Sequence, residues 1–304
     1  MSTLDVNVLK VILIYEHKRV MRKKGFYALI LLATLPPLIV MVAFKTMLIN
    51  VKLYGEETLW AQLLGVQPGM LSIASITTLL WVIGVIFGGD LYASELEDRS
   101  IEMLLSKPTT RGHIFLGKAL YLTLLLMGAY SLATLISIVV NLTVTLNVRM
   151  VHISPIIVLT LTLSTMGFAM LASLIGILVK KPTLAMILTI VIYYVLSIVS
   201  SLVLVFFVVG GFTHGQPYTA TEPIRKLLIY QSYIPTYALM MLPQVVYAYL
   251  SGGSPIPLST FTPIYFREIL NVFKDILISV LIVSIVSTLV FTIVSYVLYR
   301  RIEV

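Results

Sequence analysis

The sequence contains no cysteine and few charged residues. Asp, Glu, Lys and Arg make up only 11% of its 304 residues, whereas soluble domains typically carry about 25%. Without cysteine, the chain has no disulfide framework, thiolate metal site or cysteine nucleophile. Its four histidines, His17, His113, His152 and His214, are too scattered to form a pair with metal-ligand spacing. Because 59% of the residues are hydrophobic, the composition predicts an integral membrane protein.

Ionisable side chains are also missing from the long apolar runs. Six runs approach the roughly 20 residues that a membrane-spanning helix needs: residues 26–44, 71–89, 119–140, 156–179, 183–209 and 276–299. Proton-driven carriers generally need ionisable groups inside such spans, so this class is disfavoured, although sodium sites built from backbone and hydroxyl oxygens stay open. No clustered reactive groups indicate an intramembrane enzyme. We expect an all-α polytopic membrane protein with six transmembrane helices, forming one domain over residues 1–304.

The basic residues predict the orientation. Most of the 21 Lys and Arg residues lie in residues 1–25, residues 90–118, the Lys180–Lys181 pair and the Arg300–Arg301 pair. By the positive-inside rule these segments are cytoplasmic, including both termini, in a multi-pass protein of the cell membrane. Since the basic residues serve as membrane anchors, the net charge of +8 does not indicate nucleic-acid binding. Residues 1–25 also have the pattern of an amphipathic helix lying on the membrane surface.

Residues 210–275 are expected to form an extracellular helical cap before the last span. Within them, residues 227–250 lack charge and could span, re-enter or lie on the membrane. Pro235 and Pro243 interrupt this stretch, and its tyrosines are typical of a membrane interface. A short or re-entrant helix is therefore the favoured interpretation.

Two fragments imitate nucleotide-binding motifs. "GHIFLGKA" at residues 112–119 has the spacing of a phosphate-binding loop, but Ala119 replaces the Ser or Thr that Mg²⁺ requires, and no strand precedes it. "LSGGS" at residues 250–254 is followed at once by Pro255, which favours a turn. We predict no catalytic, cofactor-binding or metal-binding residue in the chain.

Gly84 and Gly88 form a small-xxx-small pair in the second apolar run. This spacing lets two helix backbones approach closely. The partner helix could belong to a second copy of the chain or to the same subunit.

The segment "ELEDRSIEMLLSKPTTRGHIFLGK", residues 95–118, is the densest charged stretch. On a helix, Glu95, Asp98 and Glu102 form an acidic stripe beside the apolar Leu104 and Leu105. Pro108 ends this helix, and Thr109 or Thr110 can cap the next one. A solvated connector would explain the charge, but the amphipathic pattern favours a docking surface.

This segment resembles the loop between the second and third spans of type-two ABC (ABC-2-type) exporter permeases. The matching positions are Glu95, Ser100, Glu102, Leu104, Leu105, Ser106, Pro108, Arg111, Gly117 and Lys118. The wider plan is also similar, with a basic N-terminal helix, six spans and a large external segment before the last one. The family often has Gly-Thr where this chain has Ser100–Ile101.

The resemblance implies a function for the chain. It would be a permease subunit that moves substrate outward by alternating access and is not itself an enzyme. A separate ATPase subunit would bind ATP and Mg²⁺, and a second permease copy would complete the assembly in the lipid membrane. The coupling helix that docks on the ATPase would use Glu95, Asp98, Arg99, Glu102, Leu104, Leu105, Pro108 and Arg111. An ion-coupled secondary transporter or a polytopic membrane scaffold is the alternative.

Overall fold

The computed structural model describes ten stretches of the chain: residues 6–24, 26–27, 29–31, 34–39, 42–43, 68–98, 110–145, 149–213, 228–251 and 263–302. Within these stretches the regular structure is helical and contains no strand. The helices are α1 (Val6–Met21), α4 (Pro68–Leu91), α5 (Ala93–Glu97), α7 (Arg111–Thr145), α8 (Arg149–Val179), α9 (Pro182–Thr213), α11 (Pro235–Ser251) and α12 (Pro263–Arg301). This agrees with the predicted all-α class.

Proline marks the start of four helices. Pro68, Pro182, Pro235 and Pro263 are the first residues of α4, α9, α11 and α12. The first helical position suits proline, because its missing N–H would have no helical acceptor there and its φ angle is already helical. At Pro182 and Pro235, where the preceding residues are described and not helical, proline therefore marks a helix boundary.

The helices coincide with the apolar runs. α4, α7, α8, α9 and α12 cover the predicted spans at residues 71–89, 119–140, 156–179, 183–209 and 276–299. Three described segments meet the length and hydropathy of a membrane-crossing helix: Arg111–Val139, Val151–Val179 and Asp275–Arg301. The run at residues 26–44 is described only in part, with helical residues at 26–27, 29–31, 34–39 and 42–43.

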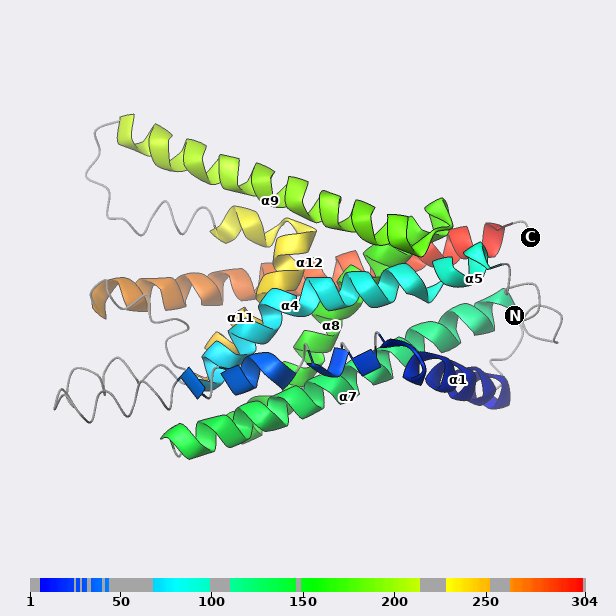
Figure 1. Ribbon diagram of the computed structural model, residues 1–304. Coiled ribbons are helices and arrows are strands. Elements are labelled where there is room, and N and C mark those ends of the chain that lie inside the picture. Colours follow the sequence, from blue (N-terminus) through cyan, green and yellow to red (C-terminus); the bar gives the residue numbers. More distant parts are fainter. Residues whose placement is uncertain are drawn as a thin grey trace.

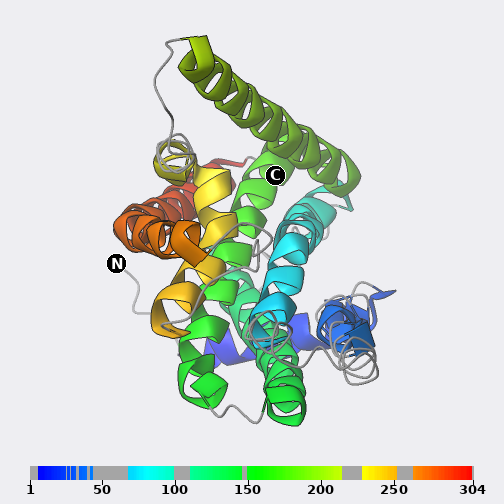
Figure 2. The same ribbon diagram turned by 90° about the vertical axis from the view of Figure 1, so that its left-hand side faces the viewer.

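Helix α8 forms the centre of the bundle. Figure 2 shows it in green between α4 in cyan and α11 in yellow. Of its most apolar stretch, 72% is buried, against 33% for α7 and 22% for α12. Many of its buried hydroxyls donate to the helix's own backbone, as Thr162 does to the carbonyl of Val158 at 2.7 Å. Such bonds satisfy polar groups where water is absent.

Gly84 and Gly88 lie against α8 of the same chain. A Cβ atom added at Gly88 would be 2.0 Å from the carbonyl oxygen of Ala169. One added at Gly84 would be 2.7 Å from Cβ of Phe168. The small-xxx-small pair therefore lets α4 and α8 approach closely within one subunit. Of the two partners that the sequence left open, this is the helix of the same chain.

The segment between α9 and α12 is shorter than the predicted residues 210–275. α9 continues to Thr213 and α12 begins at Pro263, because helical structure extends beyond the apolar runs at both ends. α11 lies between them in sequence and runs obliquely through the half of the bundle away from both chain termini (Figure 1). Its Ala238, Leu239 and Leu242 are fully buried, and it packs on α8, α12 and α4. It is thus an integral part of the bundle and not only a cover.

Candidate coupling site

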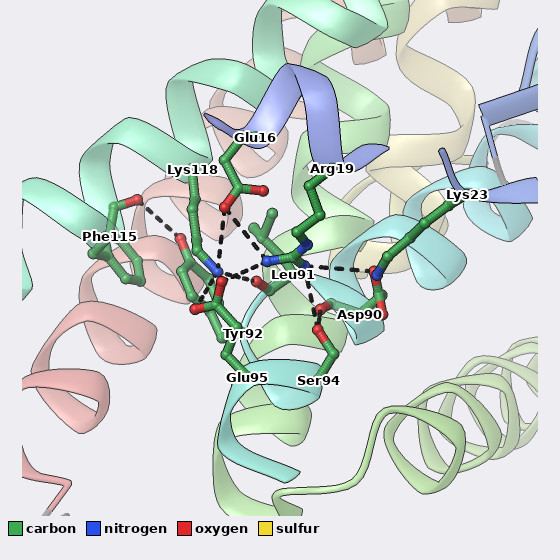
Figure 3. A network of polar contacts seen from close by, with 10 residues as sticks. All are labelled: Glu16, Arg19, Lys23, Asp90, Leu91, Tyr92, Ser94, Glu95, Phe115 and Lys118. Atoms are coloured by element: carbon green, nitrogen blue, oxygen red, sulfur yellow. Dashed lines mark hydrogen bonds and ion pairs between the residues drawn. The ribbon is translucent and has the colours of Figure 1, made fainter. Parts of the chain in front are cut away.

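Charged side chains from α1, α4, α5 and α7, together with Lys23 just after α1, meet where α4 ends. α1, α5, the start of α7 and the end of α12 gather at one end of the bundle (Figure 1). Three acidic and three basic residues form what we call the ion cluster: Glu16, Arg19, Lys23, Asp90, Glu95 and Lys118 (Figure 3). Its formal charges balance. The cluster joins segments that are far apart in sequence.

Lys118 and Glu95 form the buried centre of this cluster. Their side chains are 1% and 5% exposed, and Nζ of Lys118 lies 2.5 Å from Oε2 of Glu95. Nζ also donates to the carbonyl oxygen of Leu91 at 3.0 Å and lies 3.7 Å from Oε1 of Glu16. The Leu91 carbonyl is at the end of α4, where backbone oxygens lack helical donors and favour a cation. Lys118 thus connects α7 with α4, α5 and α1.

Arg19 connects α1 with the same centre. Its Nη1 lies 2.5 Å from Oε1 of Glu95 and 3.4 Å from Oε1 of Glu16. Its Nη2 donates to Oγ of Ser94 at 3.2 Å and lies 3.8 Å from Oδ2 of Asp90. The planar fork of a guanidinium can hold several acceptors at once. α1 is therefore tied to both α4 and α5.

The acidic neighbours also affect the ionisation of Arg19. Burial disfavours the charged guanidinium, but the carboxylates of the cluster outweigh this effect and raise the pKa of Arg19 above its ordinary value. Arg19 is therefore a fixed positive charge. Lys23, at the more exposed rim, pairs with Asp90.

An aromatic layer lies beside the ion cluster. The Tyr92 and Phe115 rings stack with centroids 4.8 Å apart and an interplanar angle of 3°. The Tyr92 hydroxyl donates to the Phe115 carbonyl at 3.1 Å, and the Tyr299 ring of α12 lies 5.1 Å from that of Tyr92. All three side chains are buried. The layer joins the turn between α4 and α5 to α7 and α12.

The start of α7 is fixed by a cap and by a contact with α12. Thr110 precedes the helix, and its Oγ1 accepts the backbone N–H of His113 at 3.4 Å, as an N-cap residue does. The Arg111 guanidinium donates to the carbonyls of Arg300, at 3.2 Å, and Ile302. Arg111 therefore satisfies backbone oxygens at the carboxyl end of α12.

The predicted docking residues fall into two groups. Glu95, Asp98 and Arg111 are described, whereas the others lie outside the described residues: Arg99, Glu102, Leu104, Leu105 and Pro108. Asp98 is exposed just after α5, where its backbone N–H donates to the Ser94 carbonyl at 3.0 Å. Within this subunit Glu95 does not face outward as Asp98 does. Its side chain is 5% exposed because Arg19 and Lys118 hold its carboxylate inside the subunit.

Sequence reasoning missed the internal partners of Glu95. Glu16 is 1% exposed and Lys118 is fully buried, although both were treated as residues of membrane-surface segments. One available signal was Glu16 itself, one of only two acidic residues in the basic stretch 1–25. An acidic residue in such a stretch indicates a specific cationic partner more than a membrane anchor.

The fragment that imitates a phosphate-binding loop does not have the structure of one. Residues 112–119, which imitate a phosphate-binding loop, lie within α7, and Lys118 points into the ion cluster (Figure 3). Backbone N–H groups inside a helix bond to helical carbonyls and do not converge on a phosphate. Among the described side chains, no group of three or more His, Asp or Glu residues is placed to hold a metal ion.

Comparison with known proteins supports the resemblance seen in residues 95–118. The family model described as "ABC-2 family transporter protein" matches residues 11–304. The search of curated proteins found no match. Because the family model spans nearly the whole chain, including most of α1, the ion cluster and α12, the chain belongs to the ABC-2 transporter family.

Proposed function

We propose that the chain is the permease subunit of an ABC exporter, driven by a separate ATPase subunit that docks on residues 90–118. ABC-2 family permeases generally pair with an ATPase subunit. The observation that carries the proposal is the ion cluster. It attaches both ends of this segment to the helical bundle through Glu95 and Lys118.

The membrane placement follows from the helices and the basic residues. Six spans would consist of residues 26–44 and the helices α4, α7, α8, α9 and α12. Both termini and residues 90–118 would then be cytoplasmic, in the cell membrane. α11 would enter the bundle from the extracellular side without crossing. The ion cluster would lie at the cytoplasmic membrane surface, where charged groups can be partly hydrated.

The cluster supplies a route for mechanical coupling. The docking segment follows directly after α5, and α5 is connected through Glu95 to Arg19 on α1 and Lys118 on α7. A displacement of the docked segment would therefore move α1, α5 and the start of α7 together. Conformational switching by rigid-body movement requires such stiff connections. The outward movement of substrate by alternating access would follow from this displacement.

The assembly would contain two permeases and two ATPase subunits. ATP and Mg²⁺ would bind to the ATPase subunits, so that this chain would have neither an ATPase site nor a cofactor. The exposed apolar face of α9 supports a second permease copy. Ile187, Val191, Val195, Ile198 and Leu202 are each at least half exposed, and α9 leans away from the other helices (Figure 2). Lipid or a second permease would cover this surface.

Co-purification with the ATPase from a neighbouring gene tests the proposal. Glu102→Lys and Leu105→Asp are expected to reduce ATPase association and permease-stimulated ATP hydrolysis at least tenfold, because they alter the predicted docking face. Glu97→Lys makes the same charge change outside the predicted stripe and should have little effect.

Intact association and unchanged hydrolysis in both variants would contradict docking at residues 90–118. Substrate movement in vesicles that contain only this chain, driven by an imposed ion gradient, would instead identify a secondary transporter.

A further inference from the structure

A groove of about 580 Å³ lies between α1, α7 and the three residues Phe26, Leu29 and Ile30. α7 lines it from Tyr121 to Leu132, and Leu13 and Leu29 contribute to the facing walls. Its size is within the range of about 300–1,000 Å³ typical of small-molecule sites. The ion cluster does not use it, because Glu16 and Arg19 of α1 point toward α5 (Figure 3). The groove is therefore a separate feature.

The groove is unfilled along α7. A Cβ atom added at Gly128 would meet nothing within 4 Å, whereas one added at Gly117 would be 2.6 Å from Cγ2 of Ile12. α1 thus packs closely on α7 near Gly117, and the two walls separate toward Gly128. An apolar molecule could lie along α7 at this position.

Its length matches one leaflet of a bilayer. At about 1.5 Å per residue, the stretch of α7 from Tyr121 to Leu132 is roughly 17 Å long. The hydrocarbon core of a bilayer is about 30 Å thick, so the groove reaches close to the midplane from its end near α1. An acyl chain of a single leaflet has this reach.

The end of the groove at α1 is polar and includes one lysine. His17 and Lys18 line it, and both are exposed. Nδ1 of His17 lies 3.4 Å from the Tyr121 hydroxyl. In the described part of the chain, Lys18 forms no ion pair, in contrast to Arg19 and Lys23, which bind the carboxylates of the ion cluster. Lys18 is therefore available to an anion at the mouth of an apolar groove.

We propose that this groove binds a phospholipid with an anionic headgroup. One acyl chain lies along α7 past Gly128, and the phosphate lies at Lys18 and His17. The inference rests on the proposed placement of α1 at the cytoplasmic membrane surface, where anionic lipids attract basic residues. The bound lipid holds α1 against α7 from a second side, in addition to the ion cluster.

Lipid retention by the purified full-length chain tests the proposal without an ATPase. The chain is incubated in detergent with phosphatidylglycerol or phosphatidylcholine that carries identical acyl chains, and retained lipid is counted by native mass spectrometry. We expect phosphatidylglycerol to be preferred, and Lys18→Gln to reduce this preference about fivefold. Lys181→Gln removes an exposed charge from another predicted cytoplasmic segment and is expected to leave the preference unchanged.

Gly128→Leu tests the apolar part of the site. The added side chain fills the groove without a backbone clash, so retention of both lipids is expected to fall at least fivefold. Circular dichroism and gel filtration check that the variant is folded. If it does not fold, a phosphatidylglycerol with a photoreactive acyl chain locates the lipid in the wild-type chain. Crosslinks are expected within residues 121–132.

Several results would overturn the proposal. These are equal retention of the two lipids by the wild type, equal effects of Lys18→Gln and Lys181→Gln, or crosslinks elsewhere. Each concerns lipid binding alone. A chain that retains phosphatidylglycerol as described but does not associate with an ATPase would contradict the proposed function and leave the lipid site standing.

Discussion

Nζ of Lys118 lies 2.5 Å from Oε2 of Glu95, and both side chains are almost completely buried. The two residues are the first and last of the charged segment 95–118. Their ion pair therefore holds the two ends of this segment together. A buried ion pair of this kind contributes a fixed geometry more than a large net stabilisation, because desolvation offsets much of the attraction.

Glu95→Ala is expected to destabilise the protein by about 3–5 kcal/mol, because Lys118 would keep a buried charge without its closest partner. Thermal unfolding in detergent measures the effect. The double variant Glu95→Leu with Lys118→Met should recover much of the loss, since it removes both charges. Glu97→Ala, at an exposed neighbour on α5, should change stability by less than about 0.5 kcal/mol. Equal losses in the Glu95 and Glu97 variants would contradict the structural role of the pair.

Arg19→Lys is expected to loosen α1 although it retains the charge. Lysine lacks the planar fork that reaches Glu95 and Ser94 together. Hydrogen exchange should become several-fold faster over residues 6–21, measured by mass spectrometry. Arg22→Lys, at an exposed position, is the matched control. Unchanged exchange in the Arg19 variant would show that the ion cluster does not hold α1 in place.

Much of the fold was predictable, because lipid imposes a simple rule on the backbone. Each long run without charge had to form a helix to satisfy its own N–H and C=O groups. The positions of α4, α7, α8, α9 and α12 follow directly. Neighbours across the bundle were not predictable in the same way. The spacing of Gly84 and Gly88 indicated a close helix contact, but only the fold shows that Ala169 of the same chain lies against Gly88.

The ion cluster shows where the sequence reading failed. The spacing of Glu95, Asp98 and Glu102 predicted one acidic stripe, because a periodic pattern describes a single helix by itself. The structure brings Arg19, more than 70 positions away, and Lys118, from α7, onto Glu95. Burial of a charge depends on such distant partners. A periodic pattern within one segment contains no information about them.

Gly88→Ala is expected to destabilise the contact between α4 and α8 by about 1–3 kcal/mol. The new Cβ atom would be 2.0 Å from the Ala169 carbonyl oxygen, and a backbone atom cannot move aside as a flexible side chain can. Gly128→Ala places the same methyl group where nothing lies within 4 Å. Its unfolding temperature should be at or slightly above that of the wild type, because alanine favours the helix more than glycine does. The two variants share the same gain in helix propensity, so a similar unfolding temperature for both would contradict the close contact at Gly88.

Lys180→Gly is expected to stabilise the turn between α8 and α9 by about 1 kcal/mol. Lys180 has a φ angle of 58°, which is unfavourable for a residue with a Cβ atom and is readily adopted by glycine. Its backbone N–H donates to the Gly176 carbonyl at 2.8 Å, and glycine can keep this bond. Lys181→Gly removes the same charge next to it. We expect Lys180→Gly, but not Lys181→Gly, to unfold at a higher temperature than the wild type. A lower unfolding temperature for Lys180→Gly would contradict backbone strain at Lys180.

Arg111→Ala separates two roles of one residue. Arg111 belongs to the predicted docking set, but its guanidinium binds the carbonyls of Arg300 and Ile302 at the end of α12. Loss of these bonds, at about 1 kcal/mol or slightly more, should increase hydrogen exchange in the last turn of α12 about fivefold, measured on the isolated permease. Arg301→Ala, at an exposed position nearby, provides the control. If ATPase association falls while exchange in α12 is unchanged, Arg111 acts at the docking surface. If exchange in α12 rises in the isolated permease and ATPase association also falls, the primary role of Arg111 is to cap α12. Docking then depends on that cap.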